Sequence, residues 1–313
     1  MQAVVIRAGE LGLVERPDPT PGDTELLVAV RGAGVNGADL AQRSGAYPAP
    51  PGWPIDIPGL ELAGEVVRVG RRVRAFSVGD RVMALVGGGG QATLAAVDES
   101  HALPVPEGLS WPAAGGFPEA YATAFDALFS QGRLALGERV LVTGASGGVG
   151  TAAVQLAAAA GAHVVAAVRD PALREAVAGL GADEVIGPDE ITARGPYDLI
   201  LELVGAPLLG VALPCLAIGG RAVVIGVGAG ARLEVDLHDL MRSRAELRGA
   251  TLRARSRAEK AAVMGALGTS VLALLAAGRL EVPVCETFPL SAAARAYERF
   301  AAPGKLGKIV LLT

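Results

Sequence analysis

The stretch from Glu138 to Gly150 constrains the fold of this chain more than any other. It reads Glu-Arg-Val-Leu-Val-Thr-Gly-Ala-Ser-Gly-Gly-Val-Gly and begins with a short apolar run that is typical of a buried parallel strand. Glycines follow, and from Thr151 the chain is rich in alanine, as in a helix packed on a sheet. A glycine turn between a strand and a helix lets backbone N–H groups approach a pyrophosphate. The stretch predicts a dinucleotide site; the alternative is an ordinary strand–helix connection that only needs small residues.

Within this turn, Ala145 stands where the first glycine of a dinucleotide fingerprint usually occurs, and Gly147 and Gly150 follow at the expected spacing. Gly144, directly before it, supplies the tight turn instead. We therefore expect the whole turn to bind the cofactor, and it consists of Gly144, Ala145, Ser146, Gly147, Gly148, Val149 and Gly150.

The rest of the chain divides into two patterns. In the middle, apolar runs alternate with helix-like segments; the predicted strands are residues 139–143, 163–168, 184–186, 198–203 and 221–226, with a sixth from Glu246 to Thr251. This alternation predicts a doubly wound parallel sheet of the Rossmann type. Residues 1–106 instead form short strands between glycine and proline turns, which is typical of a small β barrel. A long helix is expected at residues 256–277 and a last strand at 308–312.

The end of the second predicted Rossmann strand decides between the two nicotinamide cofactors. An acidic residue there accepts a hydrogen bond from the ribose 2′-OH of NAD, whereas an arginine pairs with the 2′-phosphate of NADP. Here Arg169 follows the strand at residues 163–168, with Asp170 one step beyond. We therefore predict NADP (NADPH) as the cofactor, with Arg169 as the selecting residue and Arg174 as a second cation.

Composition excludes several classes of protein. The 313 residues are 51% hydrophobic and 19% charged, which indicates a globular chain, and a formal net charge of −4 gives no reason to expect nucleic acid as a partner. The longest apolar stretch is interrupted by Gln155, Gly161 and His163, so we expect no membrane span. The first residues lack the pattern of a signal peptide, and the expected location is the cytoplasm.

No metal site is predicted. Catalytic zinc needs three protein ligands of the His, Cys or carboxylate type. The three histidines, His101, His163 and His238, are isolated from one another and from both cysteines, Cys215 and Cys285. A disulfide between those two cysteines is also not expected.

The chain resembles the zinc-independent, zeta-crystallin-like quinone oxidoreductases of the medium-chain dehydrogenase/reductase superfamily. The matching segments run in order along nearly the whole chain, at residues 34–47, 58–64, 79–85, 88–92, 104–108, 145–156 and 307–310. Zinc-binding relatives carry histidine where this chain has Leu60, and cysteine near Asn36. The resemblance therefore agrees with the absence of a zinc ligand set.

The resemblance implies an α/β protein that combines a Rossmann doubly wound parallel sheet with a mainly β, GroES-like barrel catalytic domain. The expected domains are residues 1–115 for the first part of the catalytic domain, 116–256 for the NADP-binding domain, and 257–313 for the return to the catalytic domain. By the same resemblance, Tyr47 faces the substrate, in a pocket lined by the loops at residues 47–53 and 87–91. The cofactor-binding residues it implies are Asn36, Thr123, Val204, Gly205, Gly226 and Lys308.

The expected activity is hydride transfer from NADPH to a quinone or a similar conjugated carbonyl. Tyr47 and Asn36 are the predicted catalytic residues: Tyr47 donates a hydrogen bond to the developing oxyanion, and Asn36 orients the nicotinamide. Two alternatives stay open, an enoyl reductase that acts on an enone or enoyl thioester, and a non-catalytic NADPH-binding protein. Relatives dimerise through the last Rossmann strand, so a homodimer through the edge strand from Glu246 to Thr251 is expected.

Overall fold

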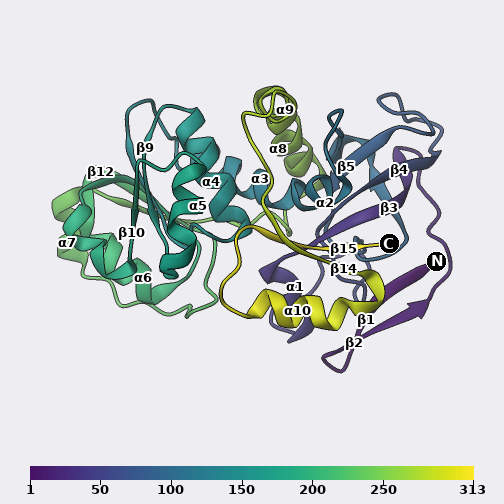
Figure 1. The fold of residues 1–313 in the computed structure, drawn as a ribbon, viewed down its shortest axis with the longest axis horizontal. Helices are drawn as coiled ribbons and strands as arrows, with labels where there is room; N and C mark the ends of the chain where they lie inside the picture. The colour runs from purple at the N-terminus through teal and green to yellow at the C-terminus, as the bar shows by residue number, and fades with distance from the viewer. The chain divides into compact units, whose positions relative to one another are not determined.

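A computed structural model describes all residues, 1–313, and the chain forms two compact units. Unit 1 contains Met1–Ala122, Leu252–Pro303 and Lys308–Thr313, and unit 2 contains Thr123–Thr251 and Gly304–Gly307. The chain therefore leaves unit 1, forms most of unit 2, returns to unit 1, and passes through unit 2 once more at Gly304–Gly307 before its last strand (Figure 1).

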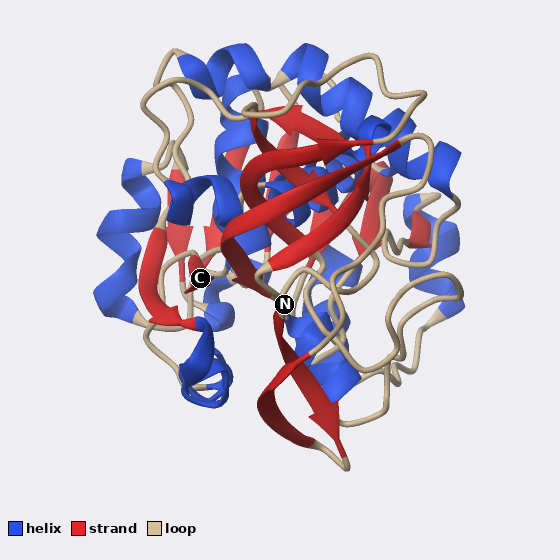
Figure 2. Ribbon diagram, turned by 90° about the vertical axis from the view of Figure 1, so that its right-hand side faces the viewer, coloured by secondary structure: helices blue, strands red, loops and turns tan.

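Unit 1 is built on a mostly antiparallel sheet. Its strand order is β14 (Val284–Pro289), β15 (Lys308–Leu312), β3 (Glu25–Val35), β4 (Glu61–Val69), β5 (Arg81–Leu85) and β7 (Ala102–Pro104), and β6 (Leu94–Asp98) pairs with β3. Only β14 and β15 pair in parallel. The hairpin of β1 (Gln2–Arg7) and β2 (Glu10–Glu15) is separate and projects from the curved strands (Figure 2). Apolar side chains that alternate along β3, among them Leu26, Val28 and Val30, form the core of this sheet.

The helices of unit 1 connect or flank these strands. They are α1 (Gly37–Arg43), α2 (Trp111–Gly116), α8 (Arg257–Ser270), α9 (Leu272–Ala276) and α10 (Ala293–Ala301); α3 (Pro118–Phe125) begins in unit 1 and ends in unit 2. The prediction of one long helix over residues 256–277 was wrong, because Val271 has φ −116° and separates α8 from α9. Thr269, Ser270 and Val271 are poor helix formers, which explains the break at this place.

Unit 2 holds a six-stranded parallel sheet. Its order is β10 (Glu184–Ile186), β9 (His163–Ala167), β8 (Arg139–Val142), β11 (Tyr197–Glu202), β12 (Leu216–Val224) and β13 (Glu246–Gly249). The connecting helices are α4 (Gly148–Ala159), α5 (Arg174–Gly179), α6 (Ala206–Ala212) and α7 (Leu237–Ser243), with a π-helical segment at Asp126–Gln131 after α3. Strand order reverses direction between β8 and β11, as in a doubly wound fold.

The predicted fold class is confirmed, and two element boundaries need correction. The strand predicted at residues 221–226 starts five residues earlier as β12, because Leu216 already pairs with Tyr197 of β11. The edge strand predicted from Glu246 to Thr251 ends at Gly249, which pairs with Val224, the last residue of β12. Beyond it, one hydrogen bond from the Ala250 N–H to the Val224 carbonyl oxygen continues the contact.

Candidate functional site

The glycine turn of unit 2 has the geometry of an anion cradle. Gly144 adopts φ +58°, a left-handed conformation that a turn directly after a strand requires. Gly147 is the N-cap of α4 and has no side chain to occupy the free N–H groups of the first helical turn. A Cβ on Gly150 would lie 2.4 Å from the Gly144 carbonyl oxygen, so only glycine lets α4 approach this closely. The turn therefore presents unoccupied backbone donors at a helix N-terminus, where a pyrophosphate fits.

Ala145, Ser146 and Val149 belong to the same turn but differ in role. The Ala145 methyl group is fully buried, so alanine at this fingerprint position fills space in the core. The Ser146 carbonyl accepts a hydrogen bond from the Gly307 N–H at 2.8 Å, which joins the segment Gly304–Gly307 to the turn. Gly148 and Val149 are in the first turn of α4.

Beyond β9, the predicted selecting residue Arg169, the predicted second cation Arg174 and the neighbouring Asp170 have different surroundings. The Asp170 carboxylate accepts the Ala172 N–H at 3.1 Å and caps a short 3-10 helix. Arg169 is exposed and makes no hydrogen bond or ion pair with the protein. Arg174 faces Glu190 at 4.0 Å, and its guanidinium lies 2.9 Å from the place that a Cβ on Gly187 would take. Of these charged groups, Arg169 is the one left without a protein partner.

A buried carboxylate shapes the end of β11, and the sequence analysis missed it. Glu202 Oε1 accepts the Val204 N–H at 2.6 Å and the Gly205 N–H at 2.7 Å. Burial raises the pKa of Glu202, while these two N–H groups favour its charged form. A Cβ on Gly226 would lie 2.1 Å from the Leu203 carbonyl oxygen. Glu202 therefore holds in place the turn that contains the predicted cofactor residues Val204 and Gly205 and that packs against Gly226. In the sequence, the only sign of this role is an acidic residue at the end of an apolar strand.

In unit 1, the structure brings Asn36 and Lys308 together with Glu61. Lys308 Nζ lies 2.6 Å from Glu61 Oε1 and donates to Asn36 Oδ1 at 2.5 Å. Asn36 Nδ2 donates to Glu61 Oε1 at 2.9 Å. All three side chains are buried, so Lys308 is an internal cation that fixes the Asn36 amide. Thr123 is also buried, in α3 of unit 2.

Two further acids adjoin this trio. Asp39 Oδ2 accepts the Asn36 N–H at 2.8 Å and Oδ1 accepts the Gly59 N–H at 2.9 Å, and burial raises the pKa of Asp39 to about 6. The Glu119 N–H donates to Glu61 Oε2 at 2.8 Å. Burial, together with the nearby charge of Glu61, raises the pKa of Glu119 to about 8. At neutral pH, Glu119 is therefore mainly a protonated acid, a role that its sequence position did not reveal.

The predicted substrate-facing residue, Tyr47, is held by an arginine distant in sequence. Arg253 is 3% exposed; its Nη1 donates to the Tyr47 carbonyl at 2.9 Å and its Nε to the Gly87 carbonyl at 2.8 Å. Its guanidinium lies 5.4 Å from the centroid of the Tyr47 ring, within cation–π range. Burial raises the pKa of the Tyr47 hydroxyl, which therefore stays protonated and can donate. Arg253 joins the two loops that were predicted to line the pocket.

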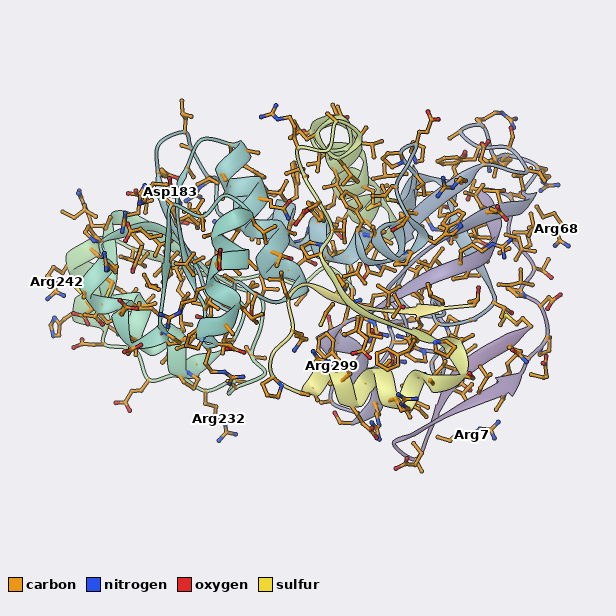
Figure 3. All side chains as sticks on the ribbon, in the orientation of Figure 1. Arg7, Arg68, Asp183, Arg232, Arg242 and Arg299 are labelled. Atoms are coloured by element: carbon orange, nitrogen blue, oxygen red, sulfur yellow. The ribbon has the colours of Figure 1, made fainter.

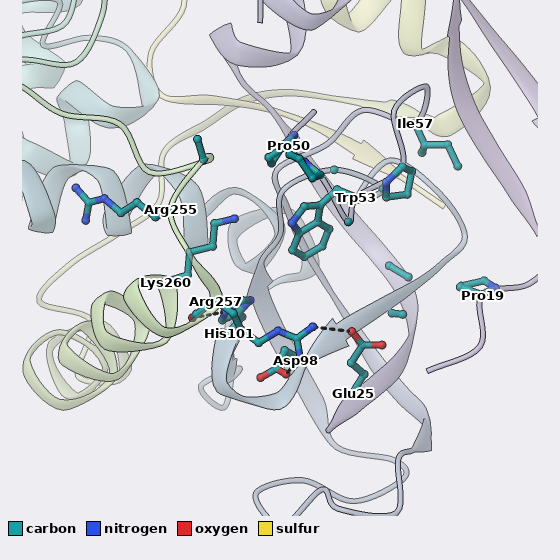
Figure 4. Close-up of a pocket in the computed structure, with 18 of the residues that line it drawn as sticks. Pro19, Glu25, Pro50, Trp53, Ile57, Asp98, His101, Arg255, Arg257 and Lys260 are labelled. Carbon is teal, nitrogen blue, oxygen red and sulfur yellow. Dashed lines mark hydrogen bonds and ion pairs between the residues drawn. The ribbon is translucent and has the colours of Figure 1, made fainter. Parts of the chain in front are cut away.

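The same loops border a cavity of about 470 Å³ that lies within unit 1 (Figure 4). Its lining includes Pro50, Trp53, Gly88, His101 and Lys260. A Cβ on Gly87 would lie 2.6 Å from the Trp53 ring, so the glycine loop is needed for this ring to lie flat against the backbone. The cavity is apolar on the side of the prolines and Trp53, and charged on the side of α8.

The structure offers no group of three or more His, Cys, Asp or Glu side chains that could hold a metal ion. Leu60, at the position where zinc-binding relatives carry histidine, is fully buried. Cys215 and Cys285 are free thiols. None of the helices has both the length and the apolar character that crossing a membrane requires.

Comparison with known proteins matches both parts of the chain. Residues 22–107 match the alcohol dehydrogenase GroES-like domain, and residues 148–266 match the zinc-binding dehydrogenase family. A quinone oxidoreductase from Rattus norvegicus is 33% identical over 305 residues, which cover 94% of this chain and 91% of that protein.

Solved structures give the same result. An alcohol dehydrogenase superfamily protein from Novosphingobium aromaticivorans superimposes with a TM-score of 0.90 at 31% identity, covering 100% of this chain and 99% of the other. A mycobacterial protein solved as a complex with NADPH has a TM-score of 0.88 at 27% identity, covering 100% of both chains. Such full-length coverage includes the glycine turn, the buried trio and the last strand.

Proposed function

Because this chain belongs to the quinone oxidoreductase family of the medium-chain dehydrogenase/reductase superfamily and is an oxidoreductase, we propose that it transfers a hydride from NADPH to a quinone or a similar conjugated carbonyl. The observation that carries the cofactor assignment is Arg169, a charged side chain without a protein partner at the end of β9. The neighbouring Asp170 uses one carboxylate oxygen to cap the short 3-10 helix that follows it. The mycobacterial complex with NADPH supports the same choice.

The residues of unit 2 fit such a dinucleotide. The first-turn N–H groups of α4 and the close approach allowed by Gly147 and Gly150 suit the pyrophosphate. Arg169 suits the 2′-phosphate. The turn from Leu203 to Gly205, fixed by Glu202, and Gly226 lie at the carboxyl ends of β11 and β12, the edge where ligands of doubly wound sheets bind.

NADPH, when bound, supplies the hydride. The protein orients the cofactor and the acceptor and excludes water from them. In this proposal Tyr47 donates a hydrogen bond to the oxygen of the acceptor, since its hydroxyl stays protonated and Arg253 holds its backbone in place. The Asn36 amide has a single fixed orientation because Lys308 and Glu61 hold its two ends. We expect it to position the nicotinamide. A quinone needs little further help, because it gains aromaticity on reduction.

We further propose that the reaction does not use zinc. Leu60 and Asn36 stand where the zinc-binding relatives carry ligands; Leu60 has no donor atom, and the Asn36 amide is engaged with Lys308 and Glu61. Metal analysis of protein purified without chelators, with activity assayed before and after dialysis against a strong chelator, tests this point. Equal activity supports it, and a loss that zinc restores contradicts it.

The test of the proposed function is an acceptor panel that follows oxidation of NADPH and of NADH. The panel contains 1,4-naphthoquinone and 1,4-benzoquinone, a simple enone, and an enoyl thioester. We expect the highest kcat/KM with the quinones and NADPH. A preference for the enoyl thioester would indicate an enoyl reductase instead. Tight NADPH binding with no turnover on any acceptor would indicate a non-catalytic role.

We also propose a homodimer through β13, the edge of the unit 2 sheet. An unpaired strand edge is a site for association, and large apolar side chains in this part of unit 2 are exposed, including Ile218, Met241 and Leu247. Leu247→Lys places a charge on that edge and is expected to shift the sedimentation coefficient to that of a monomer. Sedimentation of the unchanged protein as a monomer at micromolar concentration contradicts the proposal.

A further inference from the structure

Lys260 is a buried cation at the cavity in unit 1, and the proposed function does not use it. It comes from α8 and extends toward the Trp53 ring, with Nζ 5.2 Å from the ring centroid (Figure 4). Its side chain lines the cavity, yet the residue is only 2% exposed. It makes no hydrogen bond and no ion pair with the protein.

The other charges at the cavity leave Lys260 without a counter-charge. Glu25 and Asp98 both pair with Arg257, at 3.5 Å and 2.7 Å. His101 Nε2 lies 2.9 Å from the Arg257 carbonyl oxygen, and burial lowers the pKa of the imidazole, so His101 is neutral and adds no charge. An ionised Glu119 would favour the charged form of Lys260, but Glu119 is mainly protonated at neutral pH.

Burying an ammonium group in this way is unfavourable. Removal from water lowers the pKa of Lys260, and its cation–π contact with Trp53 returns only part of the lost hydration energy. Buried charges in proteins normally have a partner. An unpaired one that faces a cavity is best explained by a ligand that brings the opposite charge.

The rest of the cavity indicates what carries that charge. Trp53 lies against the backbone of Gly87, and Pro50, Pro51 and Pro54 supply rigid apolar surfaces beside it. The apolar walls face a basic side of the cavity, where Lys260 lies with Arg255 and Arg257, and this pairing suits a planar ligand with a single negative charge. A volume of about 470 Å³ accommodates two fused rings.

We propose that this cavity binds an aromatic carboxylate, with Lys260 pairing with the carboxylate and Trp53 and the prolines covering the rings. This binding site does not depend on the proposed hydride transfer.

The experiment uses two non-reducible probes of the same shape, 2-naphthoate and 2-naphthamide, titrated calorimetrically into the full-length protein at neutral pH. The unchanged protein is expected to bind naphthoate at least tenfold more tightly than naphthamide. Lys260→Met should bring the two dissociation constants within about twofold of each other, since the charge is lost and the apolar walls remain. Lys260→Gln serves as a second variant if the first does not fold.

Arg68→Met is the matched control, because Arg68 is an exposed side chain of β4 that projects from unit 1, and its loss removes the same charge (Figure 3). It should leave the preference for naphthoate unchanged. Equal affinity of the two probes for the unchanged protein, or a preference for naphthoate that persists without Lys260, overturns the proposal. Neither probe accepts a hydride, so these outcomes are independent of whether NADPH reduces neutral quinones.

Discussion

Glu119→Gln should change how the stability of unit 1 depends on pH. The folded protein raises the pKa of Glu119 from 4.5 to about 8, chiefly by burial. Between these two values the unfolded chain has lost the proton while the folded chain still holds it. Raising the pH therefore favours unfolding, and the stability that the protonated carboxyl contributes is present below pH 4.5 and is lost as the pH rises toward 8.

The size of the effect follows from the same shift. Each pH unit in this window lowers the free energy of unfolding by about 1.4 kcal/mol, so the loss between pH 5 and pH 7.5 is roughly 3 kcal/mol. Glutamine has nearly the same shape and does not ionise. The difference in unfolding free energy between the unchanged protein and the variant should therefore shift steadily in favour of the variant over this range.

Tryptophan fluorescence during urea unfolding is a suitable measurement. The chain has two tryptophans, Trp53 and Trp111, and both belong to unit 1, so the signal reports on the unit that contains Glu119. Glu65→Gln is the control, because Glu65 is a half-exposed carboxylate of the same unit that pairs with Arg31 at the surface. If the curves of unfolding free energy against pH are parallel for the Glu119 variant and the unchanged protein, the reasoning about its buried proton is wrong.

Three other predictions concern single side chains. Arg169→Ala should raise the KM for NADPH by about ten- to a hundredfold, the value of a lost charge-assisted hydrogen bond, and leave the KM for NADH unchanged; equal effects on both cofactors would exclude it as the selector. Tyr47→Phe should lower kcat with quinones while the Kd for NADPH stays the same, and an unchanged kcat would remove Tyr47 from the mechanism. Lys260→Met should raise the free energy of unfolding by about 1 to 3 kcal/mol, because an unpaired buried charge is replaced by an apolar side chain of similar length; a lower midpoint in urea would contradict this.

The sequence alone determined the fold class and the position of the glycine turn. Both depend on local patterns: apolar runs of strand length, helix-forming segments between them, and glycines at positions where backbone must approach backbone. The left-handed Gly144 and the close packing at Gly150 are consequences of that pattern. Exact element ends were less predictable, as at Val271, because they depend on weak local preferences and on which strand residues find partners.

The tertiary structure decided the electrostatics of unit 1. Lys308 lies 272 positions from Asn36 in sequence, and Arg253 lies 211 positions from Gln42, so no local pattern could show that they hydrogen-bond. A charged residue in a sequence is normally expected to be solvated, and nothing near Glu119 or Lys260 in the chain indicates otherwise. Burial, which only the folded chain imposes, makes Glu119 a protonated acid and leaves Lys260 a cation without a partner.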